Sequence, residues 1–274
     1  MSGRIEATGP TATDLPVGTP VVLDSRVPCG DCDWCRAGEK QRCRRLGFLG
    51  EVCDGGFAET VLTPRAAVVP IPPGLPLRVA ALAEPCAVAV HGGSRALAVS
   101  GGARTALVVG LGPLGVLAAL VLQERSLRVA GVEVDAHRRA AARGVVAMPI
   151  LAAGAEAGEP YDVVVDTAGF AGSVDACLER ARSGGTVLAL ALHRRSEVIA
   201  ANGVVERELT LLGAHVFRDE MGAALALLAA QPDRFAPLVT ADIPLGGVEE
   251  AYQILLAGGS GQLKILVTPG AGGA

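Results

Sequence analysis

The chain has 274 residues, half of them apolar, only 3% aromatic and 19% charged, with a net charge of −4. This acidic balance argues against nucleic acid or an anionic membrane as the main partner, because both bind clustered positive charge. The longest apolar stretch, Leu107 to Leu122, contains Pro113 and three glycines. It also falls short of the ~20 residues of a membrane helix. Because the amino terminus has no apolar signal core, we expect a soluble, cytoplasmic protein.

Residues 1–85 are rich in Pro, Gly, Asp and Cys and are predicted to form short strands and loops, with one strand at Val21–Leu23. A C-x2-C-x2-C-x7-C array follows that strand: Cys29, Cys32, Cys35 and Cys43. Four thiolates at such spacings predict a closed, structural zinc site, although they could also hold an iron–sulfur cluster or remain free thiols. Three isolated cysteines are predicted to be small buried apolar residues instead: Cys53, Cys86 and Cys177.

From residue 86 the sequence changes to short aliphatic runs that alternate with helical patterns, which is typical of a parallel sheet covered by helices on both faces. Continuous apolar runs predict the buried strands, at Ala106–Val109, Arg128–Val132, Asp162–Val165, Thr186–Leu190 and Leu209–Leu212. Helices are predicted between them at Gly115–Gln123, Ala136–Arg143 and Ser173–Ala181. The connection before Asp162 leaves little room for a further helix.

After Gly213 the sequence predicts two more helices and a last strand at Leu263–Val267. In the second of these helices, one face at helical spacing is apolar: Val248, Ala251, Tyr252, Leu255 and Leu256.

A glycine-rich turn stands between the first of these buried strands and the helix that follows it, in the segment TALVVGLGPLGVLAAL. In its G-x-G-x-x-G pattern, Gly110 permits the tight turn, Gly112 lets the backbone approach a pyrophosphate, and Gly115 lets the helix pack closely on the strand. The helix N-terminus then offers free N–H groups and a positive dipole end to the phosphates. The turn therefore predicts a dinucleotide site.

Glu133 closes the next predicted strand. A carboxylate at this position accepts the ribose hydroxyls of NAD and repels the extra phosphate of NADP, so NAD is the expected cofactor. Arg138 and Arg139 follow closely and are candidates to contact the adenosine, which leaves room for some tolerance of NADP.

Several motifs together resemble the zinc-containing medium-chain alcohol dehydrogenases, most closely the sorbitol and butanediol dehydrogenase branch. They are the cysteine array, GGFAE at Gly55–Glu59, EPCAVAVH at Glu84–His91, GLGPLG, DVVVDTAG at Asp162–Gly169, GGTVLALALH at Gly184–His193 and APLVT at Ala236–Thr240. The resemblance implies an α/β fold, in which a doubly wound Rossmann domain is joined to a GroES-like, mainly β catalytic domain. It implies a partial GroES-like domain at 1–85, the NAD-binding domain at 86–215, and a segment at 216–274 that returns to the catalytic domain.

The resemblance also implies roles for single residues. The four clustered cysteines would hold the structural zinc, and Glu84 matches a ligand of the catalytic zinc, although a helix-start carboxylate is an equally good interpretation. Matches to the cofactor contacts are Gly112, Pro113 and Leu114 along the pyrophosphate, Glu133 at the adenosine ribose, Leu190, Leu192, Ala214 and Val216 beside the nicotinamide, and Lys264 near the pyrophosphate. Lys264 could equally be a solvated residue at a strand end.

One departure from the family pattern concerns the catalytic zinc. Its first ligands come from a Cys-containing loop and a Gly-His-Glu segment, whereas this chain begins with residues that resemble those directly after Gly-His-Glu. We therefore expect a shortened catalytic domain with exposed apolar surface. The four histidines are predicted to be structural rather than substitute ligands: His91, His137, His193 and His215.

Three interpretations of the function follow. The first is an alcohol or polyol dehydrogenase whose start is assigned late or whose gene is trimmed. The second is a shortened enzyme that transfers hydride between a secondary alcohol and a ketone without catalytic zinc. The third is a non-catalytic protein that binds NAD or a protein partner and retains the zinc lobe. The family resemblance further implies a homodimer or homotetramer acting on a small alcohol, polyol or ketone.

Overall fold

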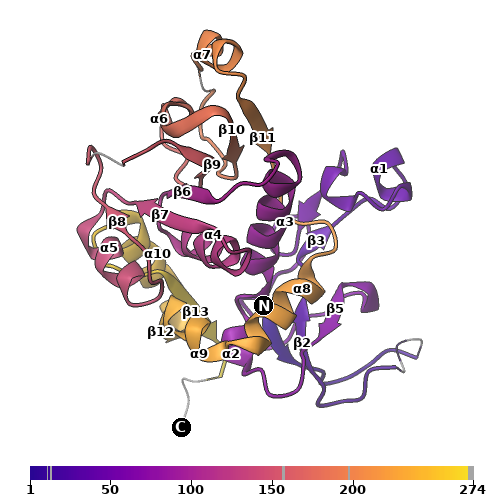
Figure 1. Cartoon of the computed structure of the whole chain (residues 1–274). Coiled ribbons are helices and arrows are strands. Elements are labelled where there is room, and N and C mark those ends of the chain that lie inside the picture. Colours follow the sequence, from indigo (N-terminus) through magenta and orange to yellow (C-terminus); the bar gives the residue numbers. More distant parts are fainter. Residues whose placement is uncertain (11, 13, 156–157, 197, 271–274) are drawn as a thin grey trace. The chain divides into compact units, whose positions relative to one another are not determined.

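The computed structural model describes residues 1–10, 12, 14–155, 158–196 and 198–270. The chain divides into two compact units (Figure 1). We call Met1–Ala87, Phe217–Leu256 and Lys264–Ala274 the cysteine unit, and Val88–Val216 with Ala257–Leu263 the sheet unit. Helix α3 (Ala83–Val99) runs from one unit into the other.

The sheet unit contains a parallel sheet of six strands in the order β11-β10-β9-β6-β7-β8. The strands are β6 (Thr105–Val109), β7 (Arg128–Val132), β8 (Ile150–Leu151), β9 (Tyr161–Asp166), β10 (Ala181–Ala189) and β11 (Thr210–Gly213). The five strands predicted from continuous apolar runs are all present, and β8 extends the sheet beyond them. The doubly wound Rossmann fold expected from the sequence is thereby confirmed.

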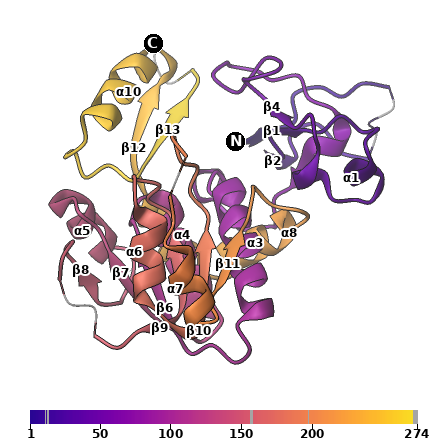
Figure 2. The same ribbon diagram turned by 90° about the horizontal axis from the view of Figure 1, so that it is seen from above.

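Helices surround this sheet (Figure 2), whose central strands consist of buried apolar residues. Helix α4 (Pro113–Glu124) packs on β6 and β7, and α6 (Ser173–Arg180) packs on β9 and β10. Every residue of α4 from Gly115 to Leu122 is buried, as is typical of a helix that is apolar on all sides. The remaining helices of this unit are α5 (Ala136–Arg143) and α7 (Ala201–Glu206).

The boundaries of some elements differ from the prediction. Strand β10 begins at Ala181 with an irregularity before Thr186, so the preceding helix ends at Arg180. Between α5 and β9 the described residues form no helix, as the short connection predicted.

The amino ends of three strands are tied together by Asp162. Its Oδ2 accepts hydrogen bonds from the N–H groups of Arg104 and Thr105, both at 2.8 Å, and from the Thr105 hydroxyl at 2.9 Å. Arg182 in β10 pairs with the other carboxylate oxygen. Burial, the largest single influence, acts to raise the pKa of Asp162, but these hydrogen bonds together lower it well below its usual range.

The cysteine unit is built from small sheets. Strands β1 (Ser2–Arg4), β2 (Pro20–Leu23) and β5 (Val68–Pro70) form an antiparallel sheet, and β3 (Arg26–Val27) pairs with β4 (Gly47–Phe48). Strands β12 (Val239–Pro244) and β13 (Lys264–Thr268) form a parallel pair. Its other helices are α1 (Asp33–Arg36), α2 (Leu77–Ala80), α8 (Met221–Ala230), α9 (Pro232–Phe235) and α10 (Val248–Ala257). The short helix α9 is additional to the two helices predicted after Gly213.

Polar contacts join the early and late segments of the cysteine unit. Arg26, only 7% exposed, pairs with Asp24 at 2.7 Å, and its guanidinium carbon lies 3.8 Å from the ring centroid of Phe217. Arg78 in α2 pairs with Asp242 in β12 at 2.8 Å. Most of the chain after residue 216, namely Phe217–Leu256 and Lys264–Ala274, therefore belongs to the same compact unit as the amino-terminal strands.

Large apolar side chains remain exposed in the cysteine unit. In α10 the predicted helix is present, but only Ala251 is buried, whereas Tyr252 and Leu256 are 54% and 70% exposed. Phe57 and Leu62 are 58% and 98% exposed in the loop that follows β4. Across the described part of the chain, no helix combines the length and the apolar character needed to cross a membrane.

Candidate functional site

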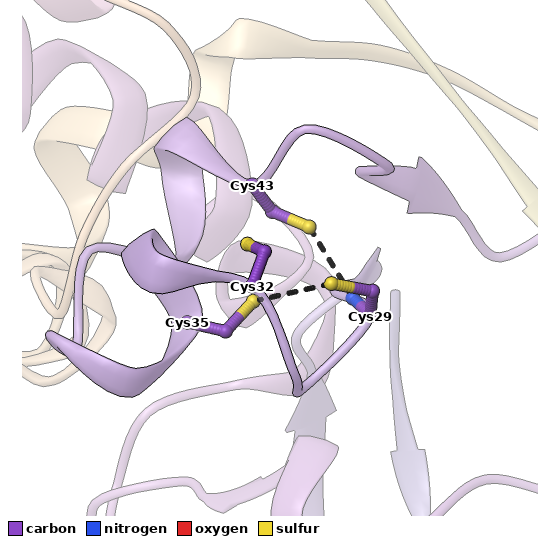
Figure 3. Close-up of side chains that lie close together, drawn as sticks. All are labelled: Cys29, Cys32, Cys35 and Cys43. Atoms are coloured by element: carbon purple, nitrogen blue, oxygen red, sulfur yellow. Dashed lines mark hydrogen bonds between the residues drawn. The ribbon is translucent and has the colours of Figure 1, made fainter.

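The four clustered cysteines converge in the cysteine unit (Figure 3). Cys29 follows β3, Cys32 is the N-cap of α1, Cys35 lies within α1, and Cys43 follows the 3-10 helix η1 (Lys40–Arg42). Their sulfur atoms all lie within 4.8 Å of one another, and the sulfurs of Cys29 and Cys35 are 3.8 Å apart. The distance is far too long for a disulfide, so the four side chains are free thiols.

This arrangement fits a tetrahedral metal ion. A zinc ion bound to four thiolates at ~2.3 Å places the sulfurs roughly 3.8 Å apart. The backbone N–H groups of Cys29 and Arg45 donate to the Cys43 sulfur at 3.3 and 3.4 Å. Backbone N–H groups of Cys35 and Arg44 likewise lower the pKa of Cys32 to about 6. Because metal binding requires thiolates, N–H groups directed at sulfur favour it.

The isolated cysteines differ from one another. Cys86 and Cys177 are completely buried, as predicted, and burial raises the pKa of Cys86 to about 12. Cys53 is exposed, so the prediction of a buried apolar role was wrong for this residue. It lies after β4, where it forms an isolated bridge with Leu49 and remains exposed to solvent.

The glycine turn joins β6 to α4 in the sheet unit. Gly110 has a φ of +88°, and a Cβ on it would stand 2.9 Å from the Cβ of Ala168. A Cβ on Gly115 would stand 1.9 Å from the Gly110 carbonyl oxygen, so the close approach of helix and strand requires glycine. At Gly112 no neighbouring atom lies within 4 Å of the Cβ position. Open space therefore remains at the N-terminus of α4, where a phosphate would lie.

The turn lies at the topological switch point of the sheet, where the strand order reverses. Strand β6 lies between β7 and β9, so the strands on either side continue the sheet in opposite directions. Ligands of open α/β sheets bind at such switch points, outside the carboxyl ends of the strands. Gly112 is the N-cap of α4 and Pro113 its first residue, while Leu114 is half-buried.

Glu133 follows β7 and contacts the glycine turn directly. Its Oε2 accepts from the Leu111 N–H at 2.8 Å, and its Oε1 accepts from the Asp135 N–H at 3.0 Å. The residue is 4% exposed. The carboxylate therefore braces the turn in addition to offering a negative charge at this edge. Arg138, in the first turn of α5, donates its N–H to the cap residue Asp135 at 2.8 Å.

The positions matched to the nicotinamide lie at the carboxyl ends of the next strands. Leu190, directly after β10, is buried, whereas Leu192 is 84% exposed. The Ala214 N–H donates to the Ala189 carbonyl at 3.3 Å. Val216 has a φ of +45°, which is rare for a β-branched residue and costs of order 1–3 kcal/mol. The structure thus places the predicted dinucleotide residues of the sheet unit along one edge of one sheet.

Two predicted residues, Glu84 and Lys264, belong to the cysteine unit. Glu84 is in the first turn of α3, as the helix-start interpretation requires, and is half-buried. Burial raises the pKa of Glu84, while the positive charges of the Met1 ammonium, Lys264 and Arg26 act in the opposite direction. Lys264 is the first residue of β13. Among the described residues, the cysteine cluster alone brings together three or more potential metal ligands of the His, Cys, Asp and Glu types.

Residues that were not predicted as part of the site lie at its centre. The Thr167 hydroxyl, after β9, donates to the carbonyl oxygens of Val109 at 3.0 Å and Gly110 at 2.7 Å. The Asp166 carboxylate is fully buried and lies 3.2 Å from the His193 Nε2. The signal that could have identified them is the pair Asp166–Thr167, which ends a continuous apolar strand at the edge where ligands bind.

A separate hollow lies at the opposite edge of the sheet. It has a volume of about 600 Å³ and is lined by residues at the amino ends of β6, β7 and β9, including Thr105, Val129 and Tyr161. Because this edge carries none of the glycine turn, we do not assign the cofactor to it.

Comparison with known proteins relates both units to one family. The sequence profile of the alcohol dehydrogenase GroES-like domain matches residues 1–73. The chain is 32% identical to D-altritol 5-dehydrogenase of Agrobacterium fabrum over 253 residues, which cover 89% of this chain and 75% of that protein. It is 35% identical to (R,R)-butanediol dehydrogenase of Saccharomyces cerevisiae over 154 residues, or 51% of this chain and 40% of that protein.

Solved structures agree with this relationship. A zinc-binding dehydrogenase from Sinorhizobium meliloti, bound to NADP, matches with a TM-score of 0.88 and 27% identity, covering 98% of this chain and 82% of that one. The 2R,3R-butanediol dehydrogenase of Bacillus subtilis matches with a TM-score of 0.84 and 25% identity, covering 98% and 79%. The chain therefore belongs to the zinc-containing medium-chain alcohol dehydrogenases, in the polyol and butanediol branch of these oxidoreductases.

Proposed function

We propose that this protein is an NAD-linked dehydrogenase that interconverts a small secondary alcohol or polyol and its ketone. The observation that carries the proposal is the glycine turn at the switch point of the parallel sheet. There Gly112 leaves open space at a helix N-terminus, and Glu133 adds a carboxylate. The relatives named for D-altritol and butanediol support the substrate class.

The residues of the sheet unit would bind and orient the cofactor. The N–H groups at the start of α4, beginning with Gly112, Pro113 and Leu114, would surround the pyrophosphate. Glu133 and Arg138 would lie at the adenosine ribose, and Leu190, Leu192, Ala214 and Val216 would line the nicotinamide. When bound, NAD supplies the hydride acceptor that the protein lacks. The negative charge of Glu133 supports NAD over NADP, although its carboxylate also holds backbone N–H groups.

Zinc is the second proposed cofactor, in a structural role at Cys29, Cys32, Cys35 and Cys43. Four sulfur ligands saturate a tetrahedral ion and leave no position for substrate. The site would therefore hold the loops of the cysteine unit in place without taking part in the reaction.

Glu84 is the residue that we propose for the reacting end of the substrate site, as the match to a catalytic-zinc ligand suggests. A catalytic zinc is normally held by about three protein ligands, and the described residues around Glu84 supply no such set. The described residues therefore do not fit a catalytic zinc at Glu84.

We assign the roles of the chain's parts as the sequence predicts. Residues 86–215 would bind the cofactor, and 1–85 with 216–274 would form the catalytic part. Self-association as a homodimer or homotetramer is supported by the exposed edge strand β11, where Leu211 is 40% exposed. A cytoplasmic location is supported by the free thiols of the cysteine cluster, because the reducing conditions there keep thiols from forming disulfides.

The decisive experiment titrates the purified chain with NADH and NADPH, followed by nicotinamide fluorescence, and then assays turnover of polyols and vicinal diols with NAD. We expect NADH to bind more tightly than NADPH and at least one diol to be oxidised. Binding of neither dinucleotide would contradict the proposal. Tight NADH binding without turnover of any alcohol would favour a non-catalytic NAD-binding protein.

A further inference from the structure

The carboxyl edge of the sheet contains a buried carboxyl group that the proposed function does not use. Asp166, the last residue of β9, is 0% exposed. Its Oδ1 accepts from the N–H groups of Ala168 at 3.0 Å and Gly169 at 3.2 Å, and its Oδ2 accepts from the Ser173 hydroxyl at 2.7 Å. These donors satisfy much of the hydrogen-bonding capacity of the carboxyl group, which is costly to bury without partners.

The imidazole of His193 also faces this carboxyl group, with its Nε2 3.2 Å from Asp166 Oδ2. Ser173 begins α6, so the positive dipole end of that helix faces the same oxygen. His193 comes from the loop after β10 and Asp166 from the end of β9. The pair therefore connects two neighbouring loops at the edge where ligands of such sheets bind.

The backbone attaches the same loop a second time. The N–H groups of Leu190 and Ala191 both donate to the Asp166 carbonyl at 3.0 Å. Leu192 thus lies between a residue held by main-chain bonds and a residue held through its side chain, yet it is itself 84% exposed. An exposed apolar side chain fixed on both sides is a preorganised surface for a planar ring, because little conformational freedom remains to be lost on binding.

Thr167, the residue directly after Asp166, connects the end of β9 to the phosphate end of the site. The Thr167 hydroxyl donates to the Val109 and Gly110 carbonyl oxygens, and Ala168 packs where a Cβ on Gly110 would stand. The Asp166–Thr167 pair therefore sets the glycine turn and the loop of Leu192 in a fixed relation within the sheet unit.

We infer that His193 is a positioning residue for the nicotinamide half of the cofactor. Through its contact with Asp166 it holds the Leu190–His193 loop so that Leu192 can pack against the ring. The inference rests on the proposed NAD function but adds a residue to it. Different elements would then bind the two halves of the dinucleotide: the glycine turn would bind the pyrophosphate, and the Leu190–His193 loop would position the nicotinamide.

The test compares two ligands on the full chain: NADH, and ADP-ribose, which has the adenosine and pyrophosphate but no nicotinamide. We expect His193→Leu to weaken NADH binding by about tenfold, within the range for one lost polar contact. Its affinity for ADP-ribose should match that of the unmodified protein. His193→Gln, which retains an N–H donor, should recover most of the loss, and Arg195→Ala, an exposed neighbour, should change neither affinity.

A second comparison asks whether His193 acts through Leu192. Leu192→Ala alone should weaken NADH binding, and adding His193→Leu to it should cause little further loss, because coupled residues are not additive. Thermal melting of each variant checks that the chain is folded.

Each result has a defined meaning. Equal loss of NADH and ADP-ribose binding in His193→Leu, unchanged NADH binding, or additive losses with Leu192→Ala would overturn the inference while leaving the proposed function intact. If the unmodified protein binds neither ligand, the proposed function fails and the inference fails with it.

Discussion

The interactions that stabilise the interior of each unit differ between the two units of this protein. The sheet unit is formed almost entirely by one continuous segment, and its strands and α4 bury apolar residues on all sides. The cysteine unit is assembled from three segments whose sheets have only two or three strands each. The thiol cluster lies within its first segment, and polar contacts such as Arg26–Phe217 and Arg78–Asp242 join that segment to the second. The sheet unit therefore depends mainly on apolar burial, whereas the cysteine unit combines apolar burial, as at Phe217 and Leu228, with polar contacts and the proposed metal site.

The strongest test of this difference is to remove a proposed metal ligand. Cys43→Ser should lower the zinc content from about one ion per chain to almost none, because structural zinc sites contribute roughly 10–16 kcal/mol of apparent binding free energy. The loops of the cysteine unit should then become sensitive to protease. Elemental analysis and limited proteolysis measure the two effects.

The sheet unit should be affected far less by that change. We expect Cys43→Ser to retain binding of ADP-ribose, measured by calorimetry. Cys53→Ser is the matched control, since Cys53 is exposed and outside the cluster. Full zinc content in Cys43→Ser would show that the cluster is not the metal site.

A second pair of variants separates packing from ligand binding in the sheet unit. Gly115→Ala would place a Cβ 1.9 Å from the Gly110 carbonyl oxygen and should destabilise the protein by roughly 3 kcal/mol or more. Gly112→Ala meets no neighbouring atom within 4 Å, so its melting temperature should change little while its cofactor affinity falls. Calorimetric melting and NADH titration of both variants measure the contrast. Equal melting temperatures for the two would argue against the close packing at Gly115.

The Asp162→Asn variant tests how the amino ends of the strands are held together at the opposite edge of the same sheet. Because the folded-state pKa of Asp162 is lowered, its carboxylate should stabilise the protein above the unfolded-state pKa of about 3.9, and this contribution should disappear as the pH falls through the lower folded-state value. Asp162→Asn should cost about 1.5–3 kcal/mol at pH 7 and less near pH 3. Urea unfolding at the two pH values measures the difference, with the exposed Asp233→Asn as control. A loss that stays the same at both pH values would contradict the role of the charge.

The sequence predicted the sheet unit better than the cysteine unit for a physical reason. Strands buried on both faces must be continuously apolar, so β6, β7, β9, β10 and β11 are visible in the sequence alone. Strand β8, with only Ile150 and Leu151, has no such run.

The site was predictable where a local pattern encodes it. The glycine turn and the cysteine array lie within short stretches, and their geometry agrees with those patterns. Asp166 and His193 meet only because β9 and β10 are neighbours in the sheet, which no local pattern specifies. The exposure of Cys53 depends in the same way on packing rather than on residue type.

The smallest expected effect concerns the apolar face of α10 in the cysteine unit. Leu256 is 70% exposed, so Leu256→Gln should change the free energy of unfolding by less than about 0.5 kcal/mol. Ala251→Gln is the matched change on the buried side of the same helix, where Ala251 is 8% exposed, and overpacking there should cost about 1–3 kcal/mol. Urea unfolding measures both, and light scattering records any change in association. A large loss in Leu256→Gln would mean that this face is covered in solution and adds to the apolar burial of the cysteine unit.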